Sequence, residues 1–377
     1  MQFRDLKAQY EALKPEIDAG IQAVIEGSGF ILGKQVKELE ERLATYVGRK
    51  YCIGVANGTE ALQLALMAMD IGPGDAVFTS DFTYFASAGC ASIIGATPVM
   101  VDIDLPTFNM SPVALERQIE KVIREGKVLP KVIIPVDLFG LPANMPEIEK
   151  IARKYGLKIL EDAAQGFGGR IESKIACSFG DMSATSFFPA KPLGCYGDGG
   201  AIFTDDDSFD ARLRSLRASG KSPEDKYDNR EIGMNSRLDT LQAAILLPKF
   251  KAFSDYELNA VNAVAERYTS ALAGHVVTPT IPDGYYSSWA QYTILLKDKE
   301  ERARIQTILK KQGIPSMIYY PRGLHQQKAY AWMKLDDKDY PNTLAATQRV
   351  LSLPMHPYLT KEDQDRVTET IVEALND

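Results

Sequence analysis

Lys191 is the residue of this chain whose type and surroundings most directly suggest chemistry. It stands between Pro189 and Pro192, after the apolar segment 183–187 and before the glycine-rich segment 194–200. The two prolines restrict the backbone, so the lysine is expected on a rigid turn. Partial desolvation lowers the pKa of a lysine and frees its amine, which can then form a Schiff base with a carbonyl. The alternative is an ordinary lysine in a solvated loop.

Two other segments carry groups that could bind a ligand. In segment 158–165 an apolar run ends in Asp162, with Gln165 close behind it, and a carboxylate held there could pair with a cationic ring nitrogen. At Gly58 an apolar strand turns into an expected helix, whose free N–H groups could hold a phosphate. Each segment has a simpler interpretation, because Asp162 and Thr59 could also be ordinary N-cap residues.

Short apolar runs alternate with helical patterns up to about residue 250, which is typical of an α/β fold. Continuous apolar strands between helices indicate a mainly parallel central sheet with helices on both faces, and ligands bind at the carboxyl ends of such strands. We expect strands at 52–56, 76–79, 98–101, 131–136, 158–160, 183–187 and 201–204. A first helix is expected to begin at Pro15 and to run to Ile25, and the Gly-Ser-Gly segment 27–29 ends it. Further helices are expected at 59–69 and 145–155.

Near residue 250 the pattern changes to helix, strand and helix, with more proline and tyrosine. We therefore predict a large α/β domain over residues 15–250 and a small C-terminal α+β domain over residues 251–377. The N-terminal segment 1–14 is predicted to pack near the small domain.

Composition excludes several classes of protein. The chain has 377 residues, with 43 Lys and Arg against 50 Asp and Glu, so its formal net charge is −7 and nucleic acid is not an expected partner. The four cysteines form no CxxC pair and the three histidines are dispersed, so neither a disulfide framework nor a metal site is expected. The uncharged segment 82–101 is expected to form a turn, a small-residue helix and a strand. With no signal peptide, a cytoplasmic protein without membrane spans is predicted.

Three motifs occur in a specific order: Gly-Thr at 58–59, Glu-Asp-Ala-Ala-Gln at 161–165 and Ser-Phe-Phe-Pro-Ala-Lys at 186–191. In this order they resemble the pyridoxal phosphate (PLP) sugar aminotransferases of the DegT/DnrJ/EryC1/StrS family, almost from end to end of the chain. The resemblance implies the PLP-dependent transferase fold type I, which is aspartate aminotransferase-like, with the cofactor in the large domain. It also implies amino transfer, because related proteins that lack the lysine catalyse dehydration.

The resemblance implies roles for individual residues around pyridoxal 5'-phosphate. Lys191 corresponds to the lysine that binds the cofactor covalently and acts as general base, and Asp162 to the partner of the ring nitrogen. Gln165 corresponds to the residue that contacts the phenolic oxygen, and Tyr84 to the one that stacks on the ring. Gly58, Thr59 and Ser186 correspond to the residues that hold the phosphate. Asn235 corresponds to a residue that reaches the phosphate of a neighbouring subunit. Asn235 thereby implies a homodimer with shared active sites. Taken alone, Tyr84 could be a core tyrosine and Asn235 a turn residue.

Segments 186–200 and 235–245 are most similar to one branch of the family. Its members move the amino group of L-glutamate to C3 of UDP-2-acetamido-2-deoxy-3-oxo-glucuronate for surface polysaccharide such as O-antigen. Arg237 matches an arginine of that branch that could pair with a carboxylate or phosphate. Tyr319 and Tyr320, where the branch has His-Tyr, and His325 are predicted to bind substrate. The alternatives are transfer to C4 or to a dTDP-linked 3-keto-6-deoxyhexose, and a non-catalytic PLP-binding regulatory protein.

Overall fold

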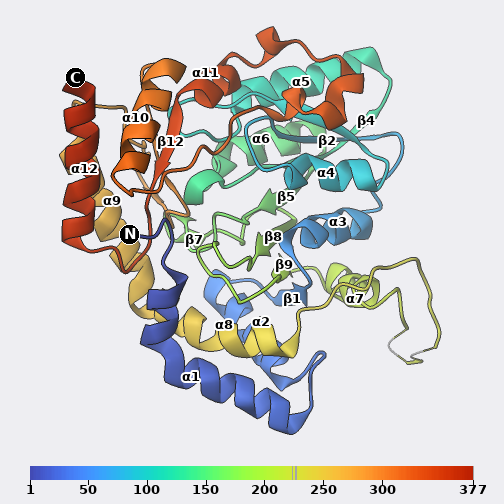
Figure 1. Cartoon of the computed structure of the whole chain (residues 1–377). Helices are drawn as coiled ribbons and strands as arrows, with labels where there is room; N and C mark the ends of the chain where they lie inside the picture. Colours follow the sequence, from blue (N-terminus) through green and yellow to red (C-terminus); the bar gives the residue numbers. More distant parts are fainter. Residues whose placement is uncertain (223, 226, 377) are drawn as a thin grey trace.

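A seven-stranded sheet forms the centre of the computed structural model, which describes residues 1–222, 224–225 and 227–376 (Figure 1). Asp377, the last residue of the predicted small domain, lies outside the described residues. In spatial order the strands are β1 (Tyr51–Val55), β9 (Gly200–Thr204), β8 (Met182–Ser186), β5 (Lys158–Asp162), β4 (Leu129–Ile134), β2 (Asp75–Ser80) and β3 (Thr97–Val101).

Strand β9 runs antiparallel to both of its neighbours, β1 and β8, whereas the other neighbouring strands of the sheet are parallel. Parallel neighbours need a long crossover connection, usually a helix, but the connection 187–199 between β8 and β9 contains none. The predicted α/β fold with a mainly parallel sheet is confirmed. The antiparallel direction of β9 is the exception, and an apolar run alone does not indicate the direction of a strand.

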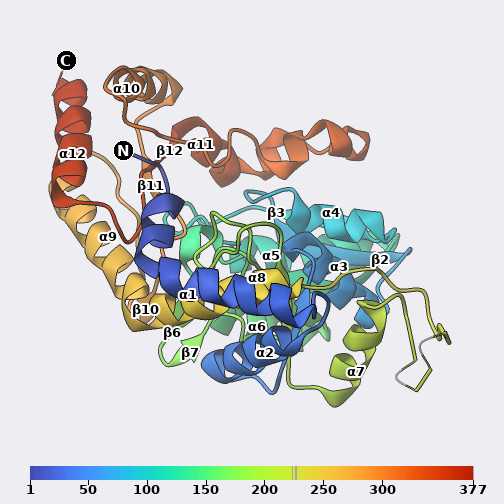
Figure 2. The same cartoon turned by 60° about the horizontal axis from the view of Figure 1, so that its bottom comes forward.

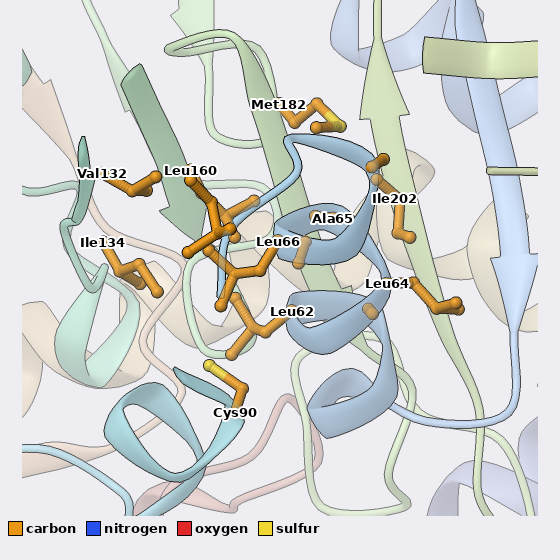
Figure 3. Close-up of a cluster of buried hydrophobic side chains, with 14 of the residues drawn as sticks. Leu62, Leu64, Ala65, Leu66, Cys90, Val132, Ile134, Leu160, Met182 and Ile202 are labelled. Atoms are coloured by element: carbon orange, nitrogen blue, oxygen red, sulfur yellow. The ribbon is translucent and has the colours of Figure 1, made fainter. Parts of the chain in front are cut away.

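Helices cover both faces of the sheet, and the strand side chains alternate between the two faces. In β4, Val132 and Ile134 belong to one core and Ile133 to another. The helix α3 (Gly58–Ala68) packs Leu62 and Leu66 into the first of these cores (Figure 3). The same face carries α4 (Ala86–Ile93) and α7 (Asp207–Leu216), and the opposite face carries α2 (Lys34–Val47), α5 (Pro112–Glu125), α6 (Met145–Tyr155) and α8 (Thr240–Ala252).

The C-terminal part of the chain builds its own hydrophobic core around two antiparallel strands. In both views this part lies at one side of the molecule, with the N-terminus beside it (Figures 1 and 2). The N–H of Met355 donates to the carbonyl of Phe3 at 3.0 Å and so holds the N-terminal segment there. The elements are α9 (Leu258–Leu272), β11 (Tyr292–Leu295), α10 (Lys299–Lys311), α11 (Pro341–Arg349), β12 (Val350–Leu353) and α12 (Lys361–Asn376).

The domain boundary predicted at residue 250 falls inside α8, and helical backbone continues through Phe253–Glu257 into α9. The division into domains over 15–250 and 251–377 therefore stays a prediction. Short strands form a further small sheet: β6 (Arg170–Ile171), β7 (Lys174–Ile175) and β10 (Tyr285–Tyr286).

The first helix is longer than predicted. Helix α1 spans Leu6–Gly27, so Pro15 lies inside it and does not start it. The helix begins where the Asp5 carboxylate accepts the N–H of Ala8 at 2.8 Å. Pro15 is exposed, so water can satisfy the carbonyl of Glu11 that the missing proline N–H leaves unpaired.

Segment 82–101 folds as predicted into a turn, α4 and β3. Its small residues let α4 pack closely, and most of that helix is buried. Among the described residues, no helix combines the length and apolar character needed to cross a bilayer.

Candidate active site

The carboxyl ends of the parallel strands form the edge where the main predicted site residues gather. Asp162 ends β5 and Ser186 ends β8, whereas Gly58 follows β1 and Tyr84 follows β2. Lys191 lies in the loop after β8. Because parallel strands end at the same edge of a sheet, residues far apart in the sequence come together here.

The amine of Lys191 is buried, and burial lowers its pKa from 10.5 to about 8. The negative charge of Asp162 opposes this shift, and the positive charge of Arg4 adds to it. A lysine with this pKa is neutral far more often near pH 7 than an exposed lysine. The neutral amine is the form that attacks a carbonyl, so the predicted Schiff-base chemistry has the amine that it requires.

Asp162 is a buried carboxylate with a hydrogen bond to each oxygen. The Ser87 hydroxyl donates to Oδ2 at 2.7 Å, and the N–H of Ala164 donates to Oδ1 at 3.2 Å. Burial raises the pKa of Asp162, and the two hydrogen bonds and the charge of Lys191 lower it in part. A cationic ring nitrogen next to Asp162 would favour the ionised form further. The N-cap interpretation is wrong, because no helix begins here.

Gln165 and two tyrosines surround the same space. The Gln165 Oε1 accepts the N–H of Phe139 at 2.9 Å, and its Nε2 donates to the hydroxyl of Tyr320 at 3.1 Å. Burial raises the pKa of Tyr320, the hydrogen bond from Gln165 lowers it in part, and the negative charge of Asp162 raises it further. Tyr84 is 58% exposed, so it is not a core tyrosine and its ring is open to a ligand.

A close approach of two backbones at the start of α3 suits a bound anion. The first turn of a helix has N–H groups without internal partners. A Cβ added to Gly58 would lie 2.7 Å from the Cβ of Ser186, so the end of β8 reaches the helix only because residue 58 is glycine. Asn57 is the N-cap, since its side chain accepts the N–H of Glu60 at 2.8 Å. The capping interpretation of Thr59 is therefore wrong, and Thr59 lies inside the first turn.

We expect Gly58→Ala to weaken binding of the phosphate group of PLP and to lower the free energy of unfolding. The added methyl group forces Ser186 or α3 to move, which costs about 1–3 kcal/mol for overpacking. Gly27→Ala is the matched control, because a Cβ there meets nothing within 4 Å. Urea unfolding and a PLP titration measure the two effects. Equal behaviour of both variants would show that the approach at Gly58 has no role in binding.

Asn235 and Arg237 lie in the connection between α7 and α8, at its base, where Asn235 pairs with Ala218 just after α7. The described part of this connection extends away from the rest of the chain in both views (Figures 1 and 2). The Arg237 guanidinium donates to the amide oxygen of Asn235. Ser236 between them is buried, and its hydroxyl accepts the N–H of Ala56 at 3.1 Å, which fixes this base next to the strand that leads to Gly58. Asn235 is exposed and Arg237 half-buried, and their contacts to a second subunit and to substrate stay predictions.

His325 occupies a buried position with a carboxylate at each ring nitrogen. Its Nδ1 lies 2.5 Å from Oδ2 of Asp81, and its Nε2 lies 2.9 Å from Oδ1 of Asp337. The ring stacks on Tyr340 with 4.3 Å between centroids. Burial lowers the pKa of His325, but the hydrogen bonds and charges of Asp81 and Asp337 outweigh it, so the pKa is raised. The predicted contact to substrate would require His325 to give up one of these carboxylates.

We expect His325→Asn to destabilise the protein by about 3–5 kcal/mol, because it removes the imidazole partner of the fully buried Asp81 carboxyl group. Asp337→Asn is the control, since the Asp337 side chain is 61% exposed and such a surface pair contributes about 0–1 kcal/mol. Chemical unfolding followed by circular dichroism measures both. A similar loss in the two variants would contradict a structural role centred on Asp81.

Ser87 is a site residue that is not among the predicted ones. It lies in the small-residue helix α4, which no motif of the sequence marks as part of a site, and its hydroxyl contacts the hydroxyl of Thr83. The two hydroxyl oxygens are 3.2 Å apart. Within the described part of the chain, no group of three His, Cys, Asp or Glu side chains is arranged to hold a metal ion.

A mainly parallel sheet that brings together a lysine of lowered pKa, a buried carboxylate and an anion-binding helix start defines an enzyme of amine and carbonyl chemistry. Residues 11–372 match the DegT/DnrJ/EryC1/StrS aminotransferase family, and the chain belongs to this family. The predicted family, the aminotransferase fold and the assignment as an enzyme are thereby confirmed.

Two similar proteins cover nearly the whole chain. The UDP-2-acetamido-2-deoxy-3-oxo-D-glucuronate aminotransferase of Pseudomonas aeruginosa is 46% identical, over 95% of this chain and 96% of that protein. A pleiotropic regulatory protein of Geobacillus stearothermophilus is 43% identical, over 98% of this chain and 97% of that protein.

Solved structures show the same fold. A DegT DnrJ EryC1 StrS aminotransferase from Brucella abortus has a TM-score of 0.95 and 46% identity, and the match covers 98% of each chain. NtdA from Bacillus subtilis, solved with the bound cofactor PMP, has a TM-score of 0.86 and 29% identity, over 97% of this chain and 82% of that chain.

Proposed function

We propose that this protein transfers the amino group of L-glutamate to C3 of UDP-2-acetamido-2-deoxy-3-oxo-glucuronate, with PLP as its cofactor. The observation that carries the proposal is the 46% identity, over 95% of the chain, to an aminotransferase of that sugar nucleotide. The buried amine of Lys191 next to Asp162 supports catalysis as well as binding.

The close approach of Ser186 to Gly58 fits the phosphate of PLP, which Gly58, Thr59 and Ser186 would hold at the start of α3. The exposed ring of Tyr84 would cover the cofactor ring. When bound, PLP supplies an aldehyde that captures an amine and a ring that accepts the electrons of the breaking Cα–H bond.

Three further side chains would control protons. Asp162, held by Ser87, keeps a proton on the ring nitrogen by presenting a negative charge in a buried place. Gln165, whose Nε2 now donates to Tyr320, would turn that amide to the phenolic oxygen of PLP. Lys191 removes the proton from the Cα of glutamate and later delivers a proton to the sugar carbon, and its pKa of about 8 suits both directions near neutral pH.

The proposal includes a homodimer in which Asn235 reaches the phosphate bound by the second subunit and Arg237 binds an acidic group of the substrate. Large apolar side chains are exposed near these two residues, with Phe30 45%, Ile31 52% and Ile232 89% exposed. Ile31 pairs with Asp239 and so lies at the base of the same connection. Exposed apolar clusters of this kind support burial against another protein surface.

The test is a comparison of sugar nucleotides with the purified holoenzyme. The probes are the UDP-linked 3-oxo-glucuronate, its 3-oxo-glucosamine counterpart with no carboxylate, and a dTDP-linked 3-keto-6-deoxyhexose, each with L-glutamate. Release of 2-oxoglutarate gives kcat/KM, and L-aspartate replaces glutamate as the donor control. We expect the highest kcat/KM with the uronate, and a preference for either other sugar would assign the enzyme to that substrate instead.

The similarity to a pleiotropic regulatory protein gives the second candidate, a PLP-binding regulator without turnover. The absorption spectrum of the bound cofactor separates the two functions. An enzyme changes its spectrum on addition of L-glutamate alone, because the first half of amino transfer needs no sugar. A spectrum that ignores glutamate, with no turnover of any sugar, would favour the regulator.

A further inference from the structure

Arg4 connects the extreme N-terminus to the loop that carries Lys191. Its Nη2 donates to the main-chain carbonyl of Lys191 at 2.9 Å, and its Nη1 donates to the carbonyl of Ala290 at 3.3 Å. One side chain therefore joins the loop after β8 to the segment before β11. The acceptors lie 187 and 286 residues away along the chain.

The backbone on both sides of Arg4 is fixed. On one side the carbonyl of Phe3 accepts the N–H of Met355 at 3.0 Å, and the ring of Phe3 packs edge-on against Tyr319 with 6.2 Å between centroids. On the other side Asp5 caps α1. Arg4 is thus held between two anchors, so its guanidinium has a defined position although it is close to the chain end.

The guanidinium of Arg4 lies in an enclosed, weakly screened environment. Burial lowers the pKa of Arg4 to about 10, so it keeps its charge at neutral pH. The adjoining cavity, lined by Arg4 and Lys191 among others, measures about 20 Å³ and has room for about one water molecule. Because burial removes water from around both groups, the two cations repel each other more than two surface cations would.

Other titratable groups also act on this pair of cations. Asp162 attracts the charge of Lys191, and Glu257 and Tyr319 attract that of Arg4. His356 lines the same cavity and is neutral, because burial lowers its pKa to about 4. Lys249 faces Glu257 and Arg4, and burial lowers its pKa to about 8. Arg4 is the cation that adds directly to the shift of Lys191.

We propose that Arg4 is a positioning residue for the proposed amino transfer: its hydrogen bond to the Lys191 carbonyl fixes the main chain there, and its own charge disfavours a positive charge on the nearby Lys191 amine. The inference rests on the proposed function and adds to it a residue outside the three motifs. Arg4 touches neither substrate nor cofactor in this role and acts through Lys191 alone.

The test measures the amine of Lys191 in the protein without cofactor. An amine-selective acylating reagent is applied at a series of pH values, and mass spectrometry follows the peptide that contains Lys191, with the exposed Lys37 as internal reference. Labelling of Lys191 in the wild type should rise through pH 8, as its pKa indicates. In R4Q, which loses the charge, we expect the midpoint at a higher pH and slower labelling at pH 7 than in the wild type.

R4K separates charge from geometry, since an ammonium keeps the charge but cannot bridge two carbonyls. We expect near wild-type labelling of Lys191 but a lower kcat at unchanged KM for glutamate. R42Q, at an exposed arginine of α2, is the control and should change neither quantity. The proposal is overturned if R4Q labels like the wild type, or if R4K keeps the full kcat. Should R4Q fail to fold, the kcat of R4K still decides.

The labelling readout needs neither PLP nor a sugar nucleotide. A negative result in R4Q would therefore leave the proposed transfer from glutamate to sugar standing. Conversely, absence of sugar turnover in the wild type would overturn the proposed function while the labelling shift in R4Q stayed measurable.

Discussion

Lys191→Ala abolishes amino transfer and leaves the fold intact. Lys191 removes and returns the proton in the proposed reaction, and loss of such an acid–base group costs about 10²–10⁴-fold in rate. Because the same amine also binds the cofactor, we expect the loss at or beyond the upper end of that range. Release of 2-oxoglutarate from glutamate and the sugar nucleotide measures the effect.

Stability should change in the opposite direction to activity. Burial lowers the pKa of Lys191 from 10.5 to about 8 in the folded chain, so between these values the unfolded chain binds more protons. The contribution of Lys191 to stability therefore rises as the pH increases from 8 to 10.5, and below pH 8 its burial is a full cost. Lys191→Ala should remove this cost and this pH dependence, which urea unfolding at pH 7 and pH 10 would detect.

Lys249→Met is the matched control for the activity measurement. Lys249 is also a buried lysine whose pKa burial lowers to about 8, but its Nζ lies over the ring of Tyr196 instead of facing Asp162. Methionine fills the same volume without a charge. We expect this variant to keep most of the activity, and a loss as large as that of Lys191→Ala would mean that burial alone, and not the place of the lysine, explains the result.

Much of the fold can be predicted because it depends on local patterns. The residues Val132–Ile134 of β4 and Ala76–Phe78 of β2 are buried on both faces of the sheet, so each is an uninterrupted apolar run in the sequence. The direction of a strand, in contrast, does not depend on a local pattern of residues. β9 has the same apolar character as its neighbours but returns without a helix, so its antiparallel pairing follows from the connection and not from its residues.

The start of α1 shows a different limit. Pro15 is a good first-turn residue, and the sequence predicts a helix start there. The cap at Asp5 and the exposed position of Pro15 decide otherwise, since water compensates the lost hydrogen bond. Local rules compete at such points, and solvent exposure, which the sequence does not give, determines the outcome.

The candidate site divides in the same way. Lys191, Asp162 and Gly58 can be found because each stands in a short motif at the end of a strand. Ser87 and Arg4 cannot, because their partners, Asp162 and Lys191, lie 75 and 187 residues away. A hydroxyl in a small-residue helix and an arginine near the N-terminus acquire a role only when the fold brings their partners to them.

Asp162→Asn should reduce amino transfer by about 10²–10³-fold or more, the effect expected when a buried electrostatic contact to the reacting group is lost. Asparagine has the shape of aspartate, so its oxygen can still accept the Ser87 hydroxyl that now lies 2.7 Å from Oδ2. Its amide has no negative charge and presents a donor where the ring nitrogen needs an acceptor. The rate and the spectrum of bound PLP measure the loss.

Asp137→Asn is the control that separates loss of a charge from loss of a buried carboxyl. Asp137 is fully buried near Glu161, and burial and that neighbouring acid raise its pKa well above the usual range, which disfavours its charged form. Asparagine can still accept the N–H of Ala143, which now lies 2.9 Å from Oδ1, and it places no negative charge beside Glu161. We therefore expect this variant to stay close to wild-type activity. If Asp137→Asn lost as much activity as Asp162→Asn, the loss in Asp162→Asn would be explained by disturbed packing and not by the missing charge.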